Sequence, residues 1–551
     1  MFKNRSLLLA FGVGAICAGL LFWLWRLDHQ GAQQLRTALA ASATPSVADA
    51  TPPADDALAA ADPVTRSLLA SLQSLIARNN ARAREALLTF KDDAAYRRFL
   101  ARAKKAGLTV LGQVDGLRTV RVHYDAFSAL QGDLLQNAGD YSAASANYMM
   151  GIPQGPPAKD SRAAVNQVPL GNHVLDFLGV DPSTPARASW GQGVTIAILD
   201  TGVAPDPTFG QNRIRYLDIG LGTAAGNGSE DGHGTSVASL AAGLAPDAPG
   251  VAPAANLLSI RVTDANGASD IFTVSQAIVA AVDAGAKIIN ISLGGYATNA
   301  ALDSAITYAN ASGAVIVAAA GNDQASQLAW PAADPRVISV GAVDAAEQQV
   351  YFSNSGPQLQ ITAPGYGVQT AWLDGQRATV DGTSASSPIV AGSIAAVMSQ
   401  SPGLSPQQAW QVLQQTVSDG GAPGDDPSFG NGIINLGWAM ARNDPTRIDT
   451  AVSSHYYDAA TNTMDFVVQN RSAQAVVDLT LNVDVNGTAT ANFIPPLAAG
   501  AIYVVKTPVD ASKLGAGETF KFTTTLVNPP GMVDAVPANN RRSSTLSAPT
   551  K

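Results

Sequence analysis

Four polar side chains of different chemical types stand where predicted strands or loops end, and together they suit acyl transfer. Asp200 is the last residue of the predicted strand in "AILDTGV". His233 begins a predicted helix of small residues in "EDGHGTSVASLAAG". Asn322 ends "VAAAGN", and Ser384 lies in "DGTSASSPIVAG", before an apolar helical run. A serine hydroxyl is a weak nucleophile until a base such as histidine removes its proton. A carboxylate orients the imidazole, and an amide N–H stabilises an oxyanion.

Each of these residues has an ordinary structural role when it is taken alone. Asp200 could cap a turn, His233 could be a buried histidine with satisfied hydrogen bonds, and Asn322 could be a turn residue. Ser384 could be a helix N-cap. The joint occurrence of an acid, an imidazole, an amide and a hydroxyl favours chemistry. The next two serines of the stretch lie two and three residues further on, and a helix turns about 100° per residue, so they should point away.

Other catalytic chemistries find little support in the chain. Cys17 is the only cysteine and lies in an apolar run, which argues against thiol catalysis and Cys-based zinc sites. None of the five histidines stands in an H-E-x-x-H pattern, so a zincin is not expected. G-x-S-x-G is absent around Ser384, which disfavours an α/β-hydrolase esterase.

A parallel sheet is the predicted scaffold for the four residues. The runs "GVTIAILD", "NLLSIRV", "KIINISLGG", "AVIVAAAGN" and "RVISVGAVD" are continuously apolar and β-branched, with helical periods between several of them. Such strands are buried on both faces, as in α/β folds. Ligands bind at the carboxyl ends of parallel strands, where Asp200 and Asn322 are expected.

The motifs of residues 169–442 resemble those of the subtilisin-like serine proteases (peptidase S8). "AILDTGV", "DGHGTSVASLAAG", "SLGG", "AAAGN" and "DGTSASSP" occur in the order Asp, His, Asn, Ser, and "WPAADPRVISVGAVD" and "YFSNSGPQLQITAPG" match as well. The resemblance implies a three-layer α/β catalytic domain. The family's nucleophile follows Gly-Thr, which is Ser384 here. The family commonly has Met then Ala next, whereas this chain has Ala385 and Ser386, which leaves the substrate preference open.

The resemblance also implies a role for each matching residue. Asp200, His233 and Ser384 would form the catalytic triad. Asn322 and the backbone N–H of Ser384 would form the oxyanion hole. The two walls of the S1 pocket would be Ser292, Leu293, Gly294 and Gly295 on one side and Ala319, Ala320 and Gly321 on the other. Small residues there suit a large apolar substrate side chain, with Asp323 near the rim to tolerate a basic one, although the alanines equally fit plain sheet packing.

Residues 63–135 form a basic segment, with twelve Lys and Arg against six Asp and Glu. A short amphipathic helix is predicted over residues 63–84, and the strand, helix, hairpin at Asp115-Gly116 and helix that follow make up most of a ferredoxin-like unit. The family carries an inhibitory propeptide at this place, so residues 63–135 are expected to be propeptide-like and to dock on the acidic remainder. An exposed linker is predicted over 136–168, with self-cleavage there; the alternative is a permanent accessory domain.

The pattern of the first 62 residues indicates that the protein is attached to a membrane. Residues 6–25 contain no charge and, at about 1.5 Å per residue, span about 30 Å, the thickness of a bilayer core. Lys3 and Arg5 precede them, which places residues 1–5 in the cytoplasm and the catalytic domain outside it. Residues 26–62 form an Ala/Pro-rich linker. The alternative is a cleaved signal peptide and secretion.

An antiparallel β-sandwich is predicted over residues 446–551. Apolar and polar residues alternate in runs such as "TMDFVVQN" and "TFKFTTTLV", and Asn486-Gly487 is a hairpin signal. The segment resembles Ig-like adhesion or binding modules of bacterial envelope proteins. It shows no catalytic set, and a surface or partner role is expected.

The whole chain of 551 residues is therefore predicted to be an exported, membrane-tethered serine endopeptidase that acts on polypeptides. Its net charge of −9 argues against nucleic-acid binding. No cofactor is expected to be required; structural calcium is common in the family, but no run of oxygen ligands assigns it. The rival hypotheses are a peptide-binding pseudoprotease and an envelope adhesion protein that acts through its C-terminal sandwich.

Overall fold

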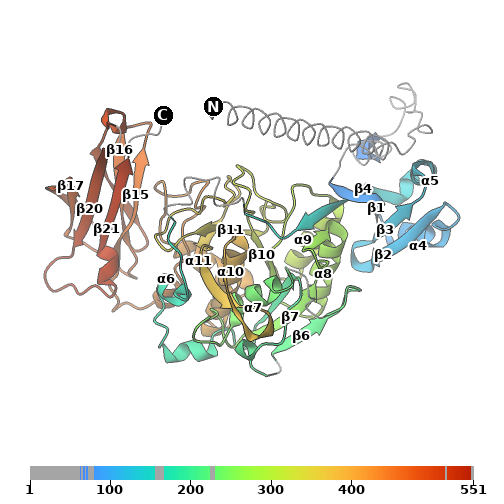
Figure 1. Ribbon diagram of the computed structural model, residues 1–551, viewed down its shortest axis with the longest axis horizontal. Coiled ribbons are helices and arrows are strands. Elements are labelled where there is room, and N and C mark those ends of the chain that lie inside the picture. The colour runs from blue at the N-terminus through green and yellow to red at the C-terminus, as the bar shows by residue number, and fades with distance from the viewer. Residues whose placement is uncertain are drawn as a thin grey trace, which may run out of the picture.

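The computed structural model describes residues 63, 66–68, 70–71, 80–155, 167–211, 213–223, 230–515 and 518–547 (Figure 1). The predicted cytoplasmic end (1–5), membrane anchor (6–25) and linker (26–62) lie outside these residues. Among the helices of the described part, none combines the length and the apolar character that crossing a bilayer requires.

The N-terminal unit has the chain order βαββαβ of a ferredoxin-like fold. Its elements are β1 (Ala81–Phe90), α4 (Asp93–Arg102), β2 (Leu108–Val114), β3 (Thr119–Tyr124), α5 (Phe127–Gln136) and β4 (Tyr141–Gly151). The strands are antiparallel in the order β2-β3-β1-β4. Asp92 caps α4 by accepting a hydrogen bond from the N–H of Ala95. Both helices bury apolar side chains, such as Phe99 and Leu130, in one core with the strands.

Two predictions for this region are wrong. The predicted exposed linker over 136–168 contains β4, which lies between β1 and the short strand β8 (Ala268–Asp270) of the catalytic unit. Small and polar residues in "YSAASANYMMG" suggested exposure, but side chains such as Tyr148 and Met150 are buried because a sheet continues on both sides. The predicted helix over 63–84 also ends too late, since β1 begins at Ala81.

The central sheet of the catalytic unit is parallel, as predicted, and seven of its strands lie in the described part of the chain. In spatial order they are β12 (Ile361–Pro364), β11 (Ile338–Val343), β10 (Val315–Ala319), β9 (Ile288–Ile291), β5 (Thr195–Asp200), β7 (Asn256–Arg261) and β6 (Ile214–Leu217). Along β5, Ile196 and Ile198 enter one hydrophobic core, and Ala197 and Leu199 enter the other. This alternation requires a cover of helices on both faces of the sheet.

Helices supply the two outer layers. The first core contains side chains of α6 (Val174–Phe177), α7 (His233–Ala242), α10 (Thr383–Gln400), α11 (Pro406–Gln415) and α12 (Leu436–Ala441). The second contains those of α8 (Ile271–Asp283) and α9 (Ala300–Ala311). α7 and α10 touch closely, because a Cβ at Gly392 would lie 2.7 Å from the carbonyl oxygen of Ala241. A hairpin of β13 (Val368–Ala371) and β14 (Arg377–Val380) precedes α10.

The C-terminal unit consists of two antiparallel sheets with one shared core. One sheet contains β15 (Thr450–Asp458), β16 (Thr463–Asn470) and β19 (Ile502–Pro508). The other contains, in spatial order, β18 (Thr488–Ile494), β17 (Leu479–Val485), β20 (Thr519–Val527) and β21 (Arg541–Ser547). Phe466 and Phe522 meet between them, with ring centroids 5.9 Å apart. The predicted hairpin turn is confirmed, since Asn486 and Gly487 both have positive φ between β17 and β18.

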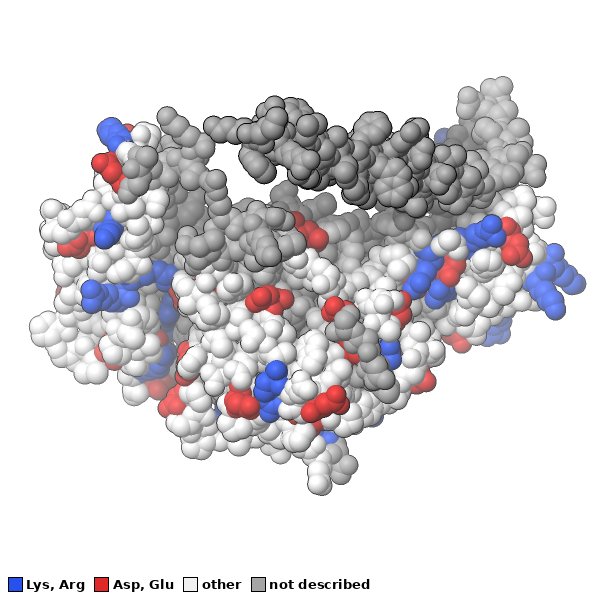
Figure 2. All heavy atoms as spheres, in the orientation of Figure 1, with Lys and Arg blue, Asp and Glu red and all other residues white. Residues whose placement is uncertain are grey.

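The N-terminal unit and the sandwich lie at opposite ends of the catalytic unit (Figure 1). Lys and Arg side chains gather on the N-terminal unit, at the right of Figure 2. Two of its arginines reach the catalytic unit, where the buried Asp270 lies 3.0 Å from Arg82 and 3.6 Å from Arg121. The predicted attraction between a basic unit and an acidic body therefore includes partly buried ion pairs on Asp270.

Candidate active site

An aspartate and a histidine meet at the carboxyl edge of the sheet. Asp200 is the last residue of β5 and is fully buried, and His233 is the first residue of α7. The Nδ1 of His233 lies 2.8 Å from Oδ1 of Asp200. An ionised carboxylate only accepts hydrogen bonds, so Nδ1 carries the proton and Nε2 is left as the basic nitrogen. Within the described part of the chain, Nε2 has no hydrogen-bond partner.

The environment of His233 makes its imidazole more basic. Burial acts to lower the pKa, but the charge and hydrogen bond of Asp200, with the charge of Glu230, outweigh it and leave the pKa raised. The imidazolium is therefore better stabilised than in water. General base catalysis requires a group that takes up a proton and is stabilised in the charged form that results.

Ser384 lies in the first turn of α10 and is 7% exposed. Two residues before it lies Gly382, whose φ of +146° is accessible to glycine and rare for other residues. A Cβ at Gly382 would lie 2.8 Å from Oγ of Ser384 and 3.0 Å from Nδ2 of Asn322. The hydroxyl and the amide therefore border one small space, and glycine keeps that space open. A hydrogen bond from Ser384 to the free Nε2 of His233 is not formed in this arrangement.

The amide of Asn322 is held in one orientation. Its Oδ1 accepts hydrogen bonds from the N–H of Thr383 (3.0 Å) and from Oγ1 of Thr383 (2.8 Å). Because the oxygen is fixed by two donors, Nδ2 is directed away from Thr383. It donates to the carbonyl oxygen of Pro153 at 2.9 Å. This distance falls within the range of about 2.7–3.1 Å expected between an oxyanion-hole donor and the oxygen that it binds.

The carbonyl on Asn322 belongs to the chain's own segment after β4. Gly151 exchanges two backbone hydrogen bonds with Gly294, at 2.9 and 2.8 Å, and β4 pairs with β8 on its other side. Residues two apart in an extended chain point the same way, so the carbonyls of Gly151 and Pro153 both face the wall that contains Gly294 and Asn322. The segment therefore lies in the cleft as an extended peptide would.

The predicted wall at 292–295 contributes mainly backbone. Gly294 pairs with Gly151, and Leu293 is buried in the second core, so its side chain does not face the cleft. The hydroxyl of Ser292 is 3.0 Å from the carbonyl oxygen of Ser384 and 2.9 Å from Oγ of Ser387, and therefore supports the turn that holds Ser384.

The other predicted wall follows β10. Ala319 and Ala320 are buried, and Ala320 packs in a small cluster with Leu328 and Leu359. Gly321 has a φ of +108°. The carboxylate of Asp323, predicted to tolerate a basic side chain, accepts a hydrogen bond from the phenol of Tyr296, and this bond raises the pKa of the phenol, together with the larger effect of burial, to about 12.

Sequence patterns missed several residues around the site. Asn354 and Tyr296 contact the Asn322 loop; Asn354 lies in the matching stretch "YFSNSGPQLQITAPG", but no pattern assigns a role to either residue. Trp372 lies against Gly232, where a Cβ would come within 2.1 Å of the indole, so the residue before His233 has to be glycine. Ser386 donates to the carbonyls of Ala363 and Pro364 and, as predicted, plays no part in the cleft.

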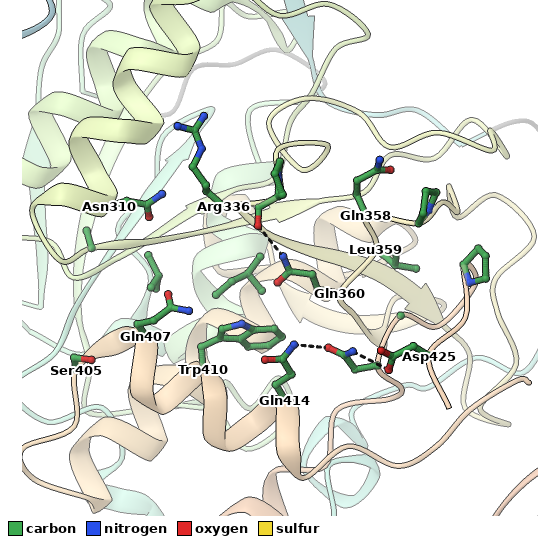
Figure 3. Close-up of a pocket in the computed structure, with 18 of the residues that line it drawn as sticks. Asn310, Arg336, Gln358, Leu359, Gln360, Ser405, Gln407, Trp410, Gln414 and Asp425 are labelled. Carbon is green, nitrogen blue, oxygen red and sulfur yellow. Dashed lines mark hydrogen bonds between the residues drawn. The ribbon is translucent and has the colours of Figure 1, made fainter. Parts of the chain in front are cut away.

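A groove with a volume of about 950 Å³ lies elsewhere on the catalytic unit (Figure 3). It is lined by the start of β10, by Trp410 and by amide side chains, among which Gln414 donates to Asn431 at 2.7 Å. None of the four predicted catalytic side chains lines it. Among the described residues, no group of three or more His, Cys, Asp or Glu side chains is arranged to hold a metal ion.

Comparisons with known proteins agree with this geometry. The profile of the Subtilase family (Peptidase S8) matches residues 191–432. A thermostable alkaline protease of Halalkalibacterium halodurans is 35% identical over 255 residues, which cover 46% of this chain and 69% of that protein. Subtilisin DY of Bacillus licheniformis is 35% identical over 262 residues, covering 46% and 92% of the two chains.

A solved structure supports the fold. The epidermin leader peptide processing serine protease of Staphylococcus aureus aligns with a TM-score of 0.53 at 21% identity, over 65% of this chain and 97% of that one. With relatives above 30% identity matched over most of their length, the chain belongs to the subtilase family, the subtilisin-like serine proteases.

Proposed function

We propose that this protein is an exported serine endopeptidase in which Ser384 attacks the peptide carbonyl. The Nε2 of His233 takes the hydroxyl proton, and Asp200 keeps the imidazole in the required tautomer and stabilises its cation. The Nδ2 of Asn322 and the backbone N–H of Ser384 receive the oxyanion. The proposal is carried by one observation: a peptide carbonyl, that of Pro153, already lies 2.9 Å from Nδ2 of Asn322.

The same contact supports self-processing between Pro153 and Gln154. In that reaction Oγ of Ser384 bonds to the carbonyl carbon of Pro153, and the C–N bond to Gln154 breaks. The proton from the hydroxyl passes through His233 to the leaving amine, and water then hydrolyses the acyl-enzyme. The paired backbones at Gly151 and Gly294 fix the register that brings this carbonyl to the oxyanion hole.

Intact mass and N-terminal sequencing of the purified chain test both proposals. The parent protein should yield a fragment that begins at Gln154, whereas Ser384→Ala should remain one chain. Ser393→Ala is the matched control, since Ser393 is a buried serine of the same helix whose hydroxyl donates to the carbonyl of Ile389 at 2.8 Å. Equal chain lengths for the parent and Ser384→Ala would rule out self-cleavage. Labelling of Ser384 by a fluorophosphonate separately distinguishes an enzyme from a peptide-binding pseudoprotease.

The placement of the enzyme outside the cytoplasm rests on residues 6–25. Their length, their lack of charge and the preceding Lys3 and Arg5 support an uncleaved single-pass anchor. Alkaline extraction of membranes from cells that express Ser384→Ala, which should remain one chain, should leave that chain in the pellet. A variant that lacks residues 6–25 should stay in the cytoplasm, and release of a full-length chain by alkali would contradict the anchor.

The sandwich is proposed to bind an envelope or surface partner in the manner of Ig-like modules. None of its described residues is among those that surround Asp200, His233, Asn322 and Ser384. It contacts the catalytic unit through side chains such as Gln469, which donates to the carbonyl of Val417 at 3.0 Å. In a chain that also lacks residues 6–25, deletion of residues 446–551 should therefore abolish binding to isolated envelope material while peptide hydrolysis per folded molecule persists. Loss of chemistry in a folded deletion variant would assign the sandwich a catalytic role instead.

A further inference from the structure

Asn354 is a fully buried asparagine whose side chain binds the loop on both sides of Asn322. Its Oδ1 accepts hydrogen bonds from the N–H of Asp323 (3.0 Å) and of Ala325 (2.9 Å). Its Nδ2 donates to the carbonyl of Ala320 at 3.1 Å, and its own N–H donates to the carbonyl of Gly321 at 3.0 Å. The loop from 320 to 325 is therefore bound to one side chain at both ends.

Gly321 shows how closely the two segments fit. Its φ of +108° is strained for any residue with a Cβ, and a Cβ placed there would lie 2.3 Å from Nδ2 of Asn354. Glycine at position 321 therefore permits both the backbone turn and the close approach of the Asn354 side chain. Asn354 itself has 0% exposure, so each of its polar atoms depends on these partners.

Asn322 and its loop are held by Thr383 and by Asn354. Thr383 binds the side-chain oxygen of Asn322, as described above, and its Oγ1 also accepts a hydrogen bond from the N–H of Gly321 at 3.1 Å. The backbone on either side of Asn322 is bound by Asn354. Movement of that backbone by 1 Å would displace Nδ2 from the oxyanion even if the bonds to Thr383 were kept, and such displacements are costly for catalysis.

We propose that Asn354 is a positioning residue that sets the oxyanion hole by acting through Asn322. The inference rests on the proposed function of Asn322. Tyr296 extends the same network to the opposite wall, because its phenol accepts a hydrogen bond from Nδ2 of Asn354 at 2.7 Å and donates to Asp323. The oxyanion hole and the loop after Gly295 are thereby joined through one buried amide.

A double-mutant cycle on the full chain tests the coupling. The variants are Asn322→Ala, Asn354→Ala and the double variant. The measurements are the rate of labelling of Ser384 by a fluorophosphonate, and kcat and KM for a p-nitroanilide of the peptide Met-Gly-Ile-Pro (residues 150–153). Asn322→Ala removes the side-chain donor of the oxyanion hole and is expected to lower kcat by about 10²–10³, the value known for subtilisin itself. Asn354→Ala should lower kcat about tenfold or more, with KM changed less than about twofold, and should change kcat less than about twofold in the Asn322→Ala background.

A matched control separates positioning from general stability. Asn470 is also fully buried, and its Nδ2 donates to three carbonyls while its Oδ1 accepts from Ser472, but it lies in the sandwich. Asn470→Ala should lower the unfolding temperature and leave kcat per active site unchanged. If Asn354→Ala does not fold, the isosteric Asn354→Asp, which keeps the two acceptor bonds and loses the two donor bonds, replaces it in the same cycle.

The outcomes distinguish the two levels of the proposal. An unchanged kcat in Asn322→Ala would overturn the proposed oxyanion hole itself. A reduced kcat in Asn322→Ala, together with independent and additive losses from the two asparagines, would overturn the role of Asn354 and leave the oxyanion hole intact. A loss in Asn354→Ala that appears only in KM would overturn it as well, because a displaced transition-state donor acts on kcat.

Discussion

The two ends of the chain dock on the catalytic unit in different ways. The N-terminal unit docks through backbone, since β4 pairs with β8 and Gly151 pairs with Gly294, and it ends in the cleft at Asn322. The sandwich docks through side chains, such as Gln469 on the carbonyl of Val417 and Arg542 on Glu347. A backbone contact in a cleft can be replaced by any extended peptide, whereas a side-chain contact requires its own partner. The first attachment therefore suits release, and the second suits permanence.

The largest effect that this comparison predicts comes from His233→Ala. Without the base the hydroxyl of Ser384 keeps its proton, and kcat should fall by about 10⁶, the value known for subtilisin. The N-terminal unit should then remain joined to the chain, while the contacts of the sandwich stay as they are. Peptide hydrolysis and gel mobility check this expectation. A cleaved N-terminal unit in His233→Ala preparations free of other proteases would show that release does not depend on this site.

A smaller loss, of about 10⁴ in kcat, is expected for Asp200→Asn, because an amide selects the wrong tautomer of the imidazole. The pH profile sharpens the test. The pKa of His233 is raised above its ordinary 6.5, and only the neutral imidazole accepts a proton, so kcat/KM of the parent should rise as pH increases through a pKa above 6.5. In the variant the charge of Asp200 is gone, and the rise should move to lower pH. A profile that does not move would exclude Asp200 as the partner that raises this pKa.

The interface of the sandwich should respond to pH, because Asp419 is buried there. Its Oδ2 lies 3.4 Å from the hydroxyl of Ser454. Burial raises its pKa from 3.8 to about 6, aided by the charge of Asp426 and opposed by hydrogen bonds from Gly424 and Ser454 and by the charge of Arg471. A folded pKa above the unfolded one gives stability that is complete below about pH 4 and is lost as pH rises through about 6.

Asp419→Asn should therefore stabilise the protein at pH 8 by up to about 3 kcal/mol and have little effect at pH 4. Midpoints of thermal unfolding at pH 4, 6 and 8 check the difference between variant and parent. A difference that is the same at all three values would show that Asp419 does not titrate in this range. The sandwich and the N-terminal unit lie at opposite ends of the catalytic unit, so this variant should leave self-cleavage unchanged.

Parts of this arrangement could be predicted from the sequence because they depend on local pattern. Buried β-branched runs predict the parallel sheet of the catalytic unit, and Asn486-Gly487 predicts a hairpin of the C-terminal sandwich. The four polar residues stand out because short motifs flank them, and the structure brings Asp200 to His233 and Ser384 to the space beside Asn322.

Other parts depend on contacts between distant residues of ordinary type. β4 is built from small and polar residues, and it is buried only because β1 and β8 flank it. Pro153 reaches Asn322 across 169 positions, and Asn354 reaches Ala320 across 34. Neither contact has a periodicity or motif that would reveal it. For the same reason, only the packing shows that the side chain of Leu293 lies in the second core.

The smallest predicted effect concerns the side-chain part of the N-terminal attachment. Arg82 donates to Asp270 at 3.0 Å, but a third of its side chain is exposed, so its loss should cost about 1 kcal/mol, or roughly a fivefold weaker hold on the cleaved N-terminal fragment. Size-exclusion chromatography of the processed protein at increasing NaCl measures this hold. Arg98→Ala is the control, because the partner of Arg98 is Asp140 of the same unit. Since the backbone pairing of β4 remains, Arg82→Ala should weaken the attachment without abolishing it, and complete release at low salt would mean that charge rather than backbone holds the fragment.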